Sequence, residues 1–166
     1  MIKIITTFFL LSFQIFTVFG SDIFEKVSNK TWFDETGFAG ISVVFMKSES
    51  GQIKAIRQIN GSGVPVIATE IYDVEIRQDT IYLINSHNGQ AKENSKDIFY
   101  TYNDRQGLLS NGKQLRILSE EPIIYVWTNK RKIIDRRVNV NKLTKISFEK
   151  NEVYIKNEVF KIIRED

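Results

Sequence analysis

The strongest constraint on the fold is a two-residue alternation of apolar and polar side chains, repeated in short segments along the chain. In the clearest segment, residues 72–77, Tyr72, Val74 and Ile76 alternate with charged residues. Side chains on a β-strand point to opposite faces in turn, so this pattern indicates a strand with one buried face. Similar segments recur about every ten to twelve residues between turn-forming residues, a spacing typical of a β-sandwich or barrel.

The residues between these segments favour tight turns. Gln78 and Asp79 lead into a second alternating segment, and Asn111-Gly112 is a strong hairpin signal because both residues tolerate positive φ. Helical turns are expected only within residues 23–27 and 89–96. The sequence therefore predicts an all-β fold, a single antiparallel up-and-down barrel of about eight to nine strands, with a β-sandwich as the alternative.

The N-terminus predicts export. Lys3 precedes a mostly apolar stretch at residues 4–19, and Gly20 follows it. This order is typical of a secretory signal peptide cleaved after Gly20, which makes the protein secreted or periplasmic and leaves residues 21–166 as one domain without a membrane span. An uncleaved anchor is the alternative, because the stretch approaches the length that a bilayer needs. The chain has no cysteine, so the domain has no disulfides to stabilise it.

Three segments of the mature chain carry a family resemblance. Trp32 lies just before the first expected strand, residues 72–83 read Tyr-x-Val-x-Ile-x-x-Asp-Thr-Ile-Tyr-Leu, and residues 143–148 read Leu-Thr-Lys-Ile-Ser-Phe. Together they resemble the small bacterial lipocalin-like, or calycin-like, β-barrel proteins. The resemblance implies an up-and-down barrel whose interior holds an apolar ligand.

Inward-facing apolar and aromatic side chains are the candidate lining of such a pocket. The candidates are Val43, Phe45, Tyr72, Val74, Ile76, Tyr82, Tyr125 and Trp127. Apolar ligand surface would be buried against them, with Tyr hydroxyls and the Trp indole N–H orienting the ligand. The alternative is a solid core, because aromatic residues at strand spacing commonly fill a β interior.

A second candidate site is a basic segment near the C-terminus. Its cations are Lys130, Arg131, Lys132, Arg136, Arg137, Lys142 and Lys145, against the single acid Asp135. Such a surface attracts an acidic protein, an acidic polysaccharide or lipid headgroups. Nucleic acid is disfavoured, because only Trp127 is near enough to stack on bases. The alternative to a binding role is a solvated hairpin whose charges prevent edge-to-edge association.

No pattern in the chain predicts catalysis, a metal site or a cofactor. His87 is the only histidine and lies in an expected turn, where a solvated side chain is the simplest interpretation. The adjacent acid pairs Asp34-Glu35 and Glu120-Glu121 would point to opposite faces of an extended chain, which does not suit paired acid and base chemistry. The sequence thus predicts a non-catalytic protein that binds a small hydrophobic ligand, or alternatively an interaction or inhibitor module with a basic surface.

Overall fold

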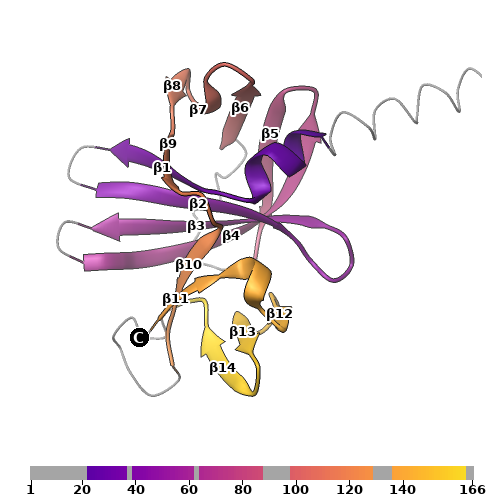
Figure 1. Ribbon diagram of the computed structural model, residues 1–166, viewed down its shortest axis with the longest axis vertical. Coiled ribbons are helices and arrows are strands. Elements are labelled where there is room, and N and C mark those ends of the chain that lie inside the picture. The colour runs from indigo at the N-terminus through magenta and orange to yellow at the C-terminus, as the bar shows by residue number, and fades with distance from the viewer. Residues whose placement is uncertain (1–21, 37–38, 62–63, 88–97, 129–135, 164–166) are drawn as a thin grey trace, which may run out of the picture.

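The computed structural model describes residues 22–36, 39–61, 64–87, 98–128 and 136–163 (Figure 1). The predicted signal peptide and the expected helical turn within residues 89–96 lie outside these ranges. A short helix at residues 22–28 contains the other expected helical turn. The strands that follow are β1 (Thr31–Thr36), β2 (Ala39–Lys47), β3 (Ile53–Gly61), β4 (Val64–Arg77), β5 (Thr80–Ser86), β6 (Phe99–Asn103), β7 (Gly107–Ser110), β8 (Lys113–Gln114), β9 (Arg116–Ser119), β10 (Ile123–Val126), β11 (Arg136–Asn139), β12 (Lys145–Ser147), β13 (Glu152–Ile155) and β14 (Glu158–Lys161).

The first nine strands form an antiparallel up-and-down barrel that is nearly closed, which confirms the predicted fold class. Strands β1 to β8 pair in chain order, so each strand turns back beside the previous one. Only Leu115 separates β8 from β9. The continuous segment 113–119 therefore pairs with β7 through β8 and with β1 through β9. The sheet closes through this segment, because one stretch of chain connects its last hairpin to its first strand.

The predicted turns at Gln78-Asp79 and Asn111-Gly112 are both confirmed. Asn111 has φ 49° and Gly112 φ 77°, and they join β7 to β8 across the pair Ser110 and Lys113. Positive φ at both central residues is the geometry that an Asn-Gly hairpin favours. Gln78 has φ 55° in the β4–β5 turn, where Arg77 pairs with Thr80.

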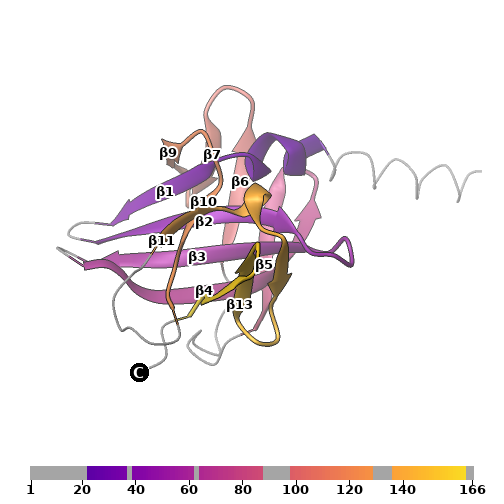
Figure 2. The same ribbon diagram turned by 60° about the horizontal axis from the view of Figure 1, so that its bottom comes forward.

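The C-terminal strands are not part of the barrel wall. Strands β10 and β11 form one pair, β12 to β14 form a three-stranded sheet, and a 3₁₀ turn at Val140–Lys142 lies between them. Both sheets lie against the outside of the barrel, over β2 to β4 (Figure 2). A bridge between Trp127 and Lys161 connects the end of β10 to β14. We call the described residues between Ile123 and Ile163, that is 123–128 and 136–163, the C-terminal layer.

Strands β2 to β4 are buried on both faces, so neighbouring residues belong to different cores. Val43 and Ala55 belong to the buried inner cluster, whereas Val44 and Ile56 pack outward against the C-terminal layer. The inner cluster consists of Ile23, Phe24, Val27, Trp32, Val43, Phe45, Ala55, Tyr72, Ile81, Leu83, Tyr100, Leu108 and Leu115. On β4, Tyr72 likewise lies in the inner cluster, and Ile71 packs outward. The barrel wall therefore separates an inner core from an outer core.

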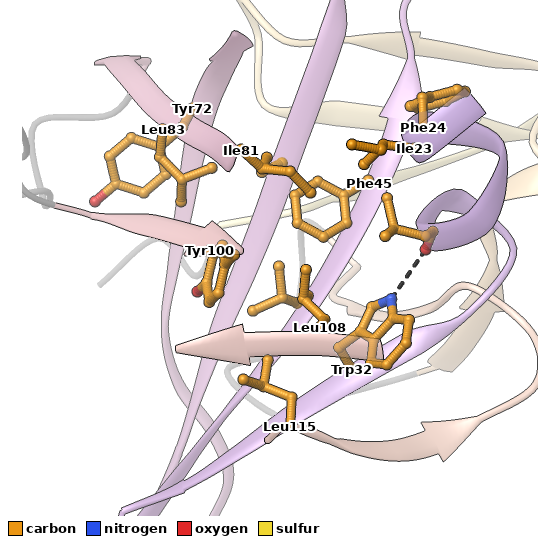
Figure 3. Packing of buried hydrophobic residues seen from close by; sticks show 13 residues of the cluster. Ile23, Phe24, Trp32, Phe45, Tyr72, Ile81, Leu83, Tyr100, Leu108 and Leu115 are labelled. Carbon is orange, nitrogen blue, oxygen red and sulfur yellow. Dashed lines mark hydrogen bonds between the residues drawn. The ribbon is translucent and has the colours of Figure 1, made fainter. Parts of the chain in front are cut away.

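The helix at residues 22–28 closes one end of the barrel. Ile23, Phe24 and Val27 are buried in the inner cluster. The indole Nε1–H of Trp32 donates a hydrogen bond of 3.0 Å to the Val27 carbonyl, which holds the helix against β1 (Figure 3). No helix among the described residues is long and apolar enough to cross a membrane.

Candidate functional site in the barrel interior

The inner cluster next to the helix is apolar and closely packed. Phe45 meets Tyr100 edge-on, with ring centroids 6.2 Å apart and planes at 87°. Leu108 lies between these rings and Trp32, and Leu115 lies next to Leu108 (Figure 3). This half of the interior is protein core.

Five of the eight predicted pocket residues lie on the inner face. Val43, Phe45 and Tyr72 are buried in the inner cluster, and Val74 and Ile76 pack against it. The strand register brings them together, because Tyr72 pairs with Ala55, and Ala55 pairs with Phe45.

The other three predicted pocket residues lie elsewhere. Tyr82 lies between the inward Ile81 and Leu83, so it faces outward, where its ring packs near Phe99 at 6.3 Å. Tyr125 lies in β10 and Trp127 directly follows it, so both belong to the C-terminal layer. Alternation alone does not reveal which face of a strand points into a barrel.

An ion pair that no pattern in the sequence predicts lies on the same inner face. Arg57 on β3 pairs directly with Glu70 on β4, and Nη1 is 2.5 Å from Oε2. Their side chains are only 10% and 14% exposed. Arg57 lies two residues from Ala55 and Glu70 two residues from Tyr72, both inward, and the Arg57 guanidinium is 5.9 Å from the Tyr72 ring.

One donor of this pair is unsatisfied. The Nε of Arg57 is buried and has no hydrogen-bond partner among the described residues. Buried polar groups in folded proteins are nearly always paired, and an unpaired one costs about 1–3 kcal/mol. Within the described part of the barrel, this inward-facing donor is therefore a cost to stability that no hydrogen bond offsets.

Two buried phenols accompany Arg57. Burial raises the pKa of Tyr72 to about 12, with the Glu70 carboxylate acting in the same direction. Burial also raises the pKa of Tyr100. Both hydroxyls remain protonated at neutral pH, and Figure 3 shows their oxygens on the side of the cluster away from the helix.

The row of residues next to Arg57 is partly accessible to water. Four half-buried residues form this row by pairing in succession across β1 to β4. They are Asp34, Ile41, Ile59 and Ala68. Arg57 lies in the next row toward the helix, between Val43 and Glu70. The interior thus changes from a dry apolar end at the helix to a polar, water-accessible end. We call Arg57, Glu70, Tyr72 and Tyr100 the inner polar cluster.

A weak sequence signal marks this cluster. Arg57 shares its strand face with Ile53, Ala55 and Ile59, and Glu70 shares its face with Tyr72 and Val74. The unusual feature is a charged residue at a position where the alternation otherwise places an apolar residue. Its partner, 13 residues away, becomes evident only from the register.

On the outer face, Gln58 lies next to Arg57 in sequence, and both ends of its side-chain amide are hydrogen-bonded. Gln58 accepts a hydrogen bond of 2.8 Å from the Tyr125 N–H and donates one of 2.8 Å to the Tyr125 carbonyl. Its amide also donates to the Thr69 hydroxyl at 3.2 Å. These bonds attach β10 to the barrel wall.

His87 is exposed in a bend, as expected, and it also belongs to a second charged group on the outer face. Its Nε2 is 2.7 Å from the Asp73 carboxylate and 3.0 Å from Lys54 Nζ, and Lys54 also contacts Asp73 directly. Burial raises the pKa of Asp73, but hydrogen bonds from Lys54 and His87 outweigh burial, and the net pKa lies below its ordinary value. Lys54 is buried and lies over the Phe148 ring at 5.5 Å, so this group also joins the wall to the C-terminal layer.

The predicted basic surface is only partly described. Lys130, Arg131 and Lys132 lie outside the described residues. Arg136 pairs with Glu158 at 3.1 Å and Lys142 with Glu121 at 4.0 Å. Arg137 and Lys145 lie over the rings of Tyr125 and Tyr154 at 5.8 and 5.9 Å. These four cations all have intramolecular neighbours.

A separate hollow lies on the surface near the β6–β7 turn. It encloses about 590 Å³, and its lining includes Trp32, Arg105, Gly107 and Arg116. Its nearby acid, Asp104, is bound to Lys26 at 2.9 Å. The hollow is open to solvent and is not part of the inner polar cluster.

No protein-family model, curated protein or solved structure matches this chain. Within the part of the chain that the structure describes, no group of three or more acidic or histidine side chains is placed to hold a metal ion. The candidate site therefore rests on the geometry of the barrel interior.

Proposed function

We propose that this protein is an exported, non-catalytic binding protein that holds a small, largely apolar molecule inside the barrel, at the inner polar cluster. The observation that carries the proposal is the buried Nε–H of Arg57, which has no partner among the described residues. A buried ion pair contributes little net stability compared with apolar packing, so stability alone does not explain it. A ligand oxygen in contact with this donor would remove its cost.

The arrangement of the interior supports this proposal. A ligand entering past Ile41, Ile59 and Ala68 would bury its apolar surface against these half-buried side chains. Its polar group would then reach the level of Arg57 and Glu70. Mostly apolar walls with a few convergent polar groups are typical of small-molecule sites.

The described cations of the basic surface do not favour the alternative function. Arg136 and Lys142 are already in ion pairs, and Arg137 lies over an aromatic ring. Binding an acidic partner there would exchange these contacts for new ones of the same kind.

Two neighbouring residues on β4 provide a matched test. Ala68 lies on the inner face and is half-buried, whereas Ile67 faces outward and is 53% exposed. The experiment titrates residues 21–166 with the neutral fluorescent probe N-phenyl-1-naphthylamine. We expect wild-type protein to bind the probe, Ala68→Trp to weaken binding by at least about tenfold by filling the entry to the cluster, and Ile67→Trp to leave it unchanged.

Circular dichroism of both variants checks that the barrel is folded. If Ala68→Trp unfolds the protein, Ala68→Leu tests the same position with a smaller side chain. An absence of probe binding by wild-type protein, or equal losses in the inward and outward variants, would contradict the proposal.

A further inference from the structure

The charges of the barrel interior restrict the chemistry of the ligand. At the water-accessible end, the described inner face carries one cation, Arg57, and two carboxylates, Glu70 and Asp34. Asp34 faces inward because it pairs with Ile41, which packs against the inner cluster. Tyr72 and Tyr100 are neutral.

Glu70 already neutralises Arg57. Their direct contact at 2.5 Å uses Nη1 of the guanidinium and Oε2 of the carboxylate. With Asp34 included, the group has a net charge of −1 without a ligand. A ligand carboxylate would add a second negative charge beside two others, in an environment that screens charge less well than water.

The unsatisfied atom is nevertheless a donor. The Arg57 Nε–H requires an acceptor. The Tyr72 hydroxyl already interacts with Glu70 and Arg57, and the Tyr100 hydroxyl interacts with Arg57. A ligand with only donor groups, such as an ammonium, would leave Nε–H unpaired. A purely aliphatic ligand would leave it unpaired as well.

We infer that the ligand is an uncharged, mostly apolar molecule bearing an oxygen acceptor, such as an ester, ketone or alcohol, and that Arg57 Nε–H donates to this oxygen. The inference rests on the proposed function and specifies the ligand class for the same site. It excludes a fatty carboxylate as the preferred ligand, because Glu70 already occupies the anion position beside Arg57.

The test compares three molecules with the same twelve-carbon chain: methyl dodecanoate, dodecan-1-ol and dodecanoic acid. Each displaces N-phenyl-1-naphthylamine from wild-type residues 21–166 at pH 8, where the acid is ionised. We expect the ester and the alcohol to bind at least about tenfold more tightly than the acid. Tighter or equal binding of the acid would overturn the inference.

Charge variants show whether the discrimination arises at this cluster. Asp34→Asn is expected to strengthen binding of the acid severalfold while the ester is nearly unaffected, because the amide removes one repelling charge. Asp79→Asn is the control, since Asp79 lies exposed in the β4–β5 turn. An equal response to both variants would show that selectivity arises from overall charge and overturn the inference.

The outcomes separate the two proposals. If wild-type protein binds neither the probe nor any of the three molecules, the proposed function fails, and the inference about ligand class fails with it. If the probe binds at the inward site and the acid is preferred, only the inference about ligand class fails.

Discussion

Arg57 and Gln58 are neighbours in sequence on opposite faces of one strand, and they use their polar groups differently. Gln58 faces outward, and both ends of its amide bond to Tyr125. Arg57 faces inward, pairs with Glu70 and leaves Nε unpaired among the described residues. The Gln58 amide has a structural role, because its hydrogen bonds attach the C-terminal layer to the barrel wall. The inner polar group retains a free bonding position, which we assign to a ligand.

The largest expected effect comes from breaking the inner ion pair on one side only. Arg57→Met leaves the Glu70 carboxylate buried without its partner and should lower the free energy of unfolding by about 3–5 kcal/mol in urea denaturation. The double variant Arg57→Met/Glu70→Leu should recover most of this loss, because apolar packing replaces both charges. Arg77→Met is the control at an exposed arginine. A double variant as unstable as the single one would show that the ion pair stabilises the fold, as the outward Gln58 does, and would contradict the difference between the two residues.

The second largest effect is expected on the free energy of unfolding when Gln58, the outward residue, is replaced. Gln58→Leu leaves the Tyr125 N–H and carbonyl without their partners and should lower the free energy of unfolding by about 2–3 kcal/mol. Binding of N-phenyl-1-naphthylamine to the folded variant should be unchanged, because Gln58 does not face the interior. Gln52→Leu, at an exposed position before β3, should change neither quantity. Loss of probe binding in the folded Gln58 variant would remove the distinction between the two faces.

A smaller loss of stability is expected when Trp32 is replaced at the end of the barrel that the helix closes. Trp32→Phe removes the hydrogen bond from Nε1 to the Val27 carbonyl and part of the buried ring, and should lower the free energy of unfolding by about 1–2 kcal/mol. Probe affinity should change little, because Trp32 packs against the helix end. Thermal denaturation and probe titration of the same sample measure both. A large loss of probe affinity would place the ligand at the helix end instead of the polar end.

The smallest effect concerns acid stability on the outer face. The folded pKa of Asp73 lies below its ordinary value of 3.8, so its ion pair contributes stability above that value and loses it as pH falls through the folded pKa. Urea denaturation of the Asp73→Asn variant between pH 2 and 6 should therefore show a weaker decline in stability toward acid than wild-type protein. Glu49→Gln, at an exposed turn, should retain the wild-type decline. Identical curves for all three proteins would show that this outer charge group contributes nothing to acid stability.

The sequence predicts the strands better than it predicts their faces. Alternation at Tyr72–Arg77 and the Asn111-Gly112 turn identify hairpins correctly, because both signals are local. The inward direction is a property of the closed barrel, so Tyr82 is indistinguishable in sequence from a pocket residue although it faces outward. The separation of the C-terminal layer was not predicted either, because its short strands alternate like those of the wall.

The site was harder to predict than the fold, for a related reason. Charged residues in a strand normally face water, so Arg57 and Glu70 resemble surface residues until the register pairs them inside the barrel. His87 lies in a bend as the sequence predicts, but its contacts with Lys54 and Asp73 are not evident from the sequence because these residues are distant along the chain. Three-dimensional pairing, rather than residue type, reveals both charged groups.

The most direct test of the contrast between the two faces observes both residues at once. In ¹H–¹⁵N NMR spectra of residues 21–166, the Arg57 Nε–H and the Gln58 side-chain amide give separate signals, assigned with Arg57→Met/Glu70→Leu and Gln58→Leu. Addition of methyl dodecanoate should shift the Arg57 signal, because its Nε–H acquires an acceptor, and should leave the Gln58 amide in place. A Gln58 amide that moves while the Arg57 signal stays unchanged would contradict the assignment of the inner polar cluster as the ligand site.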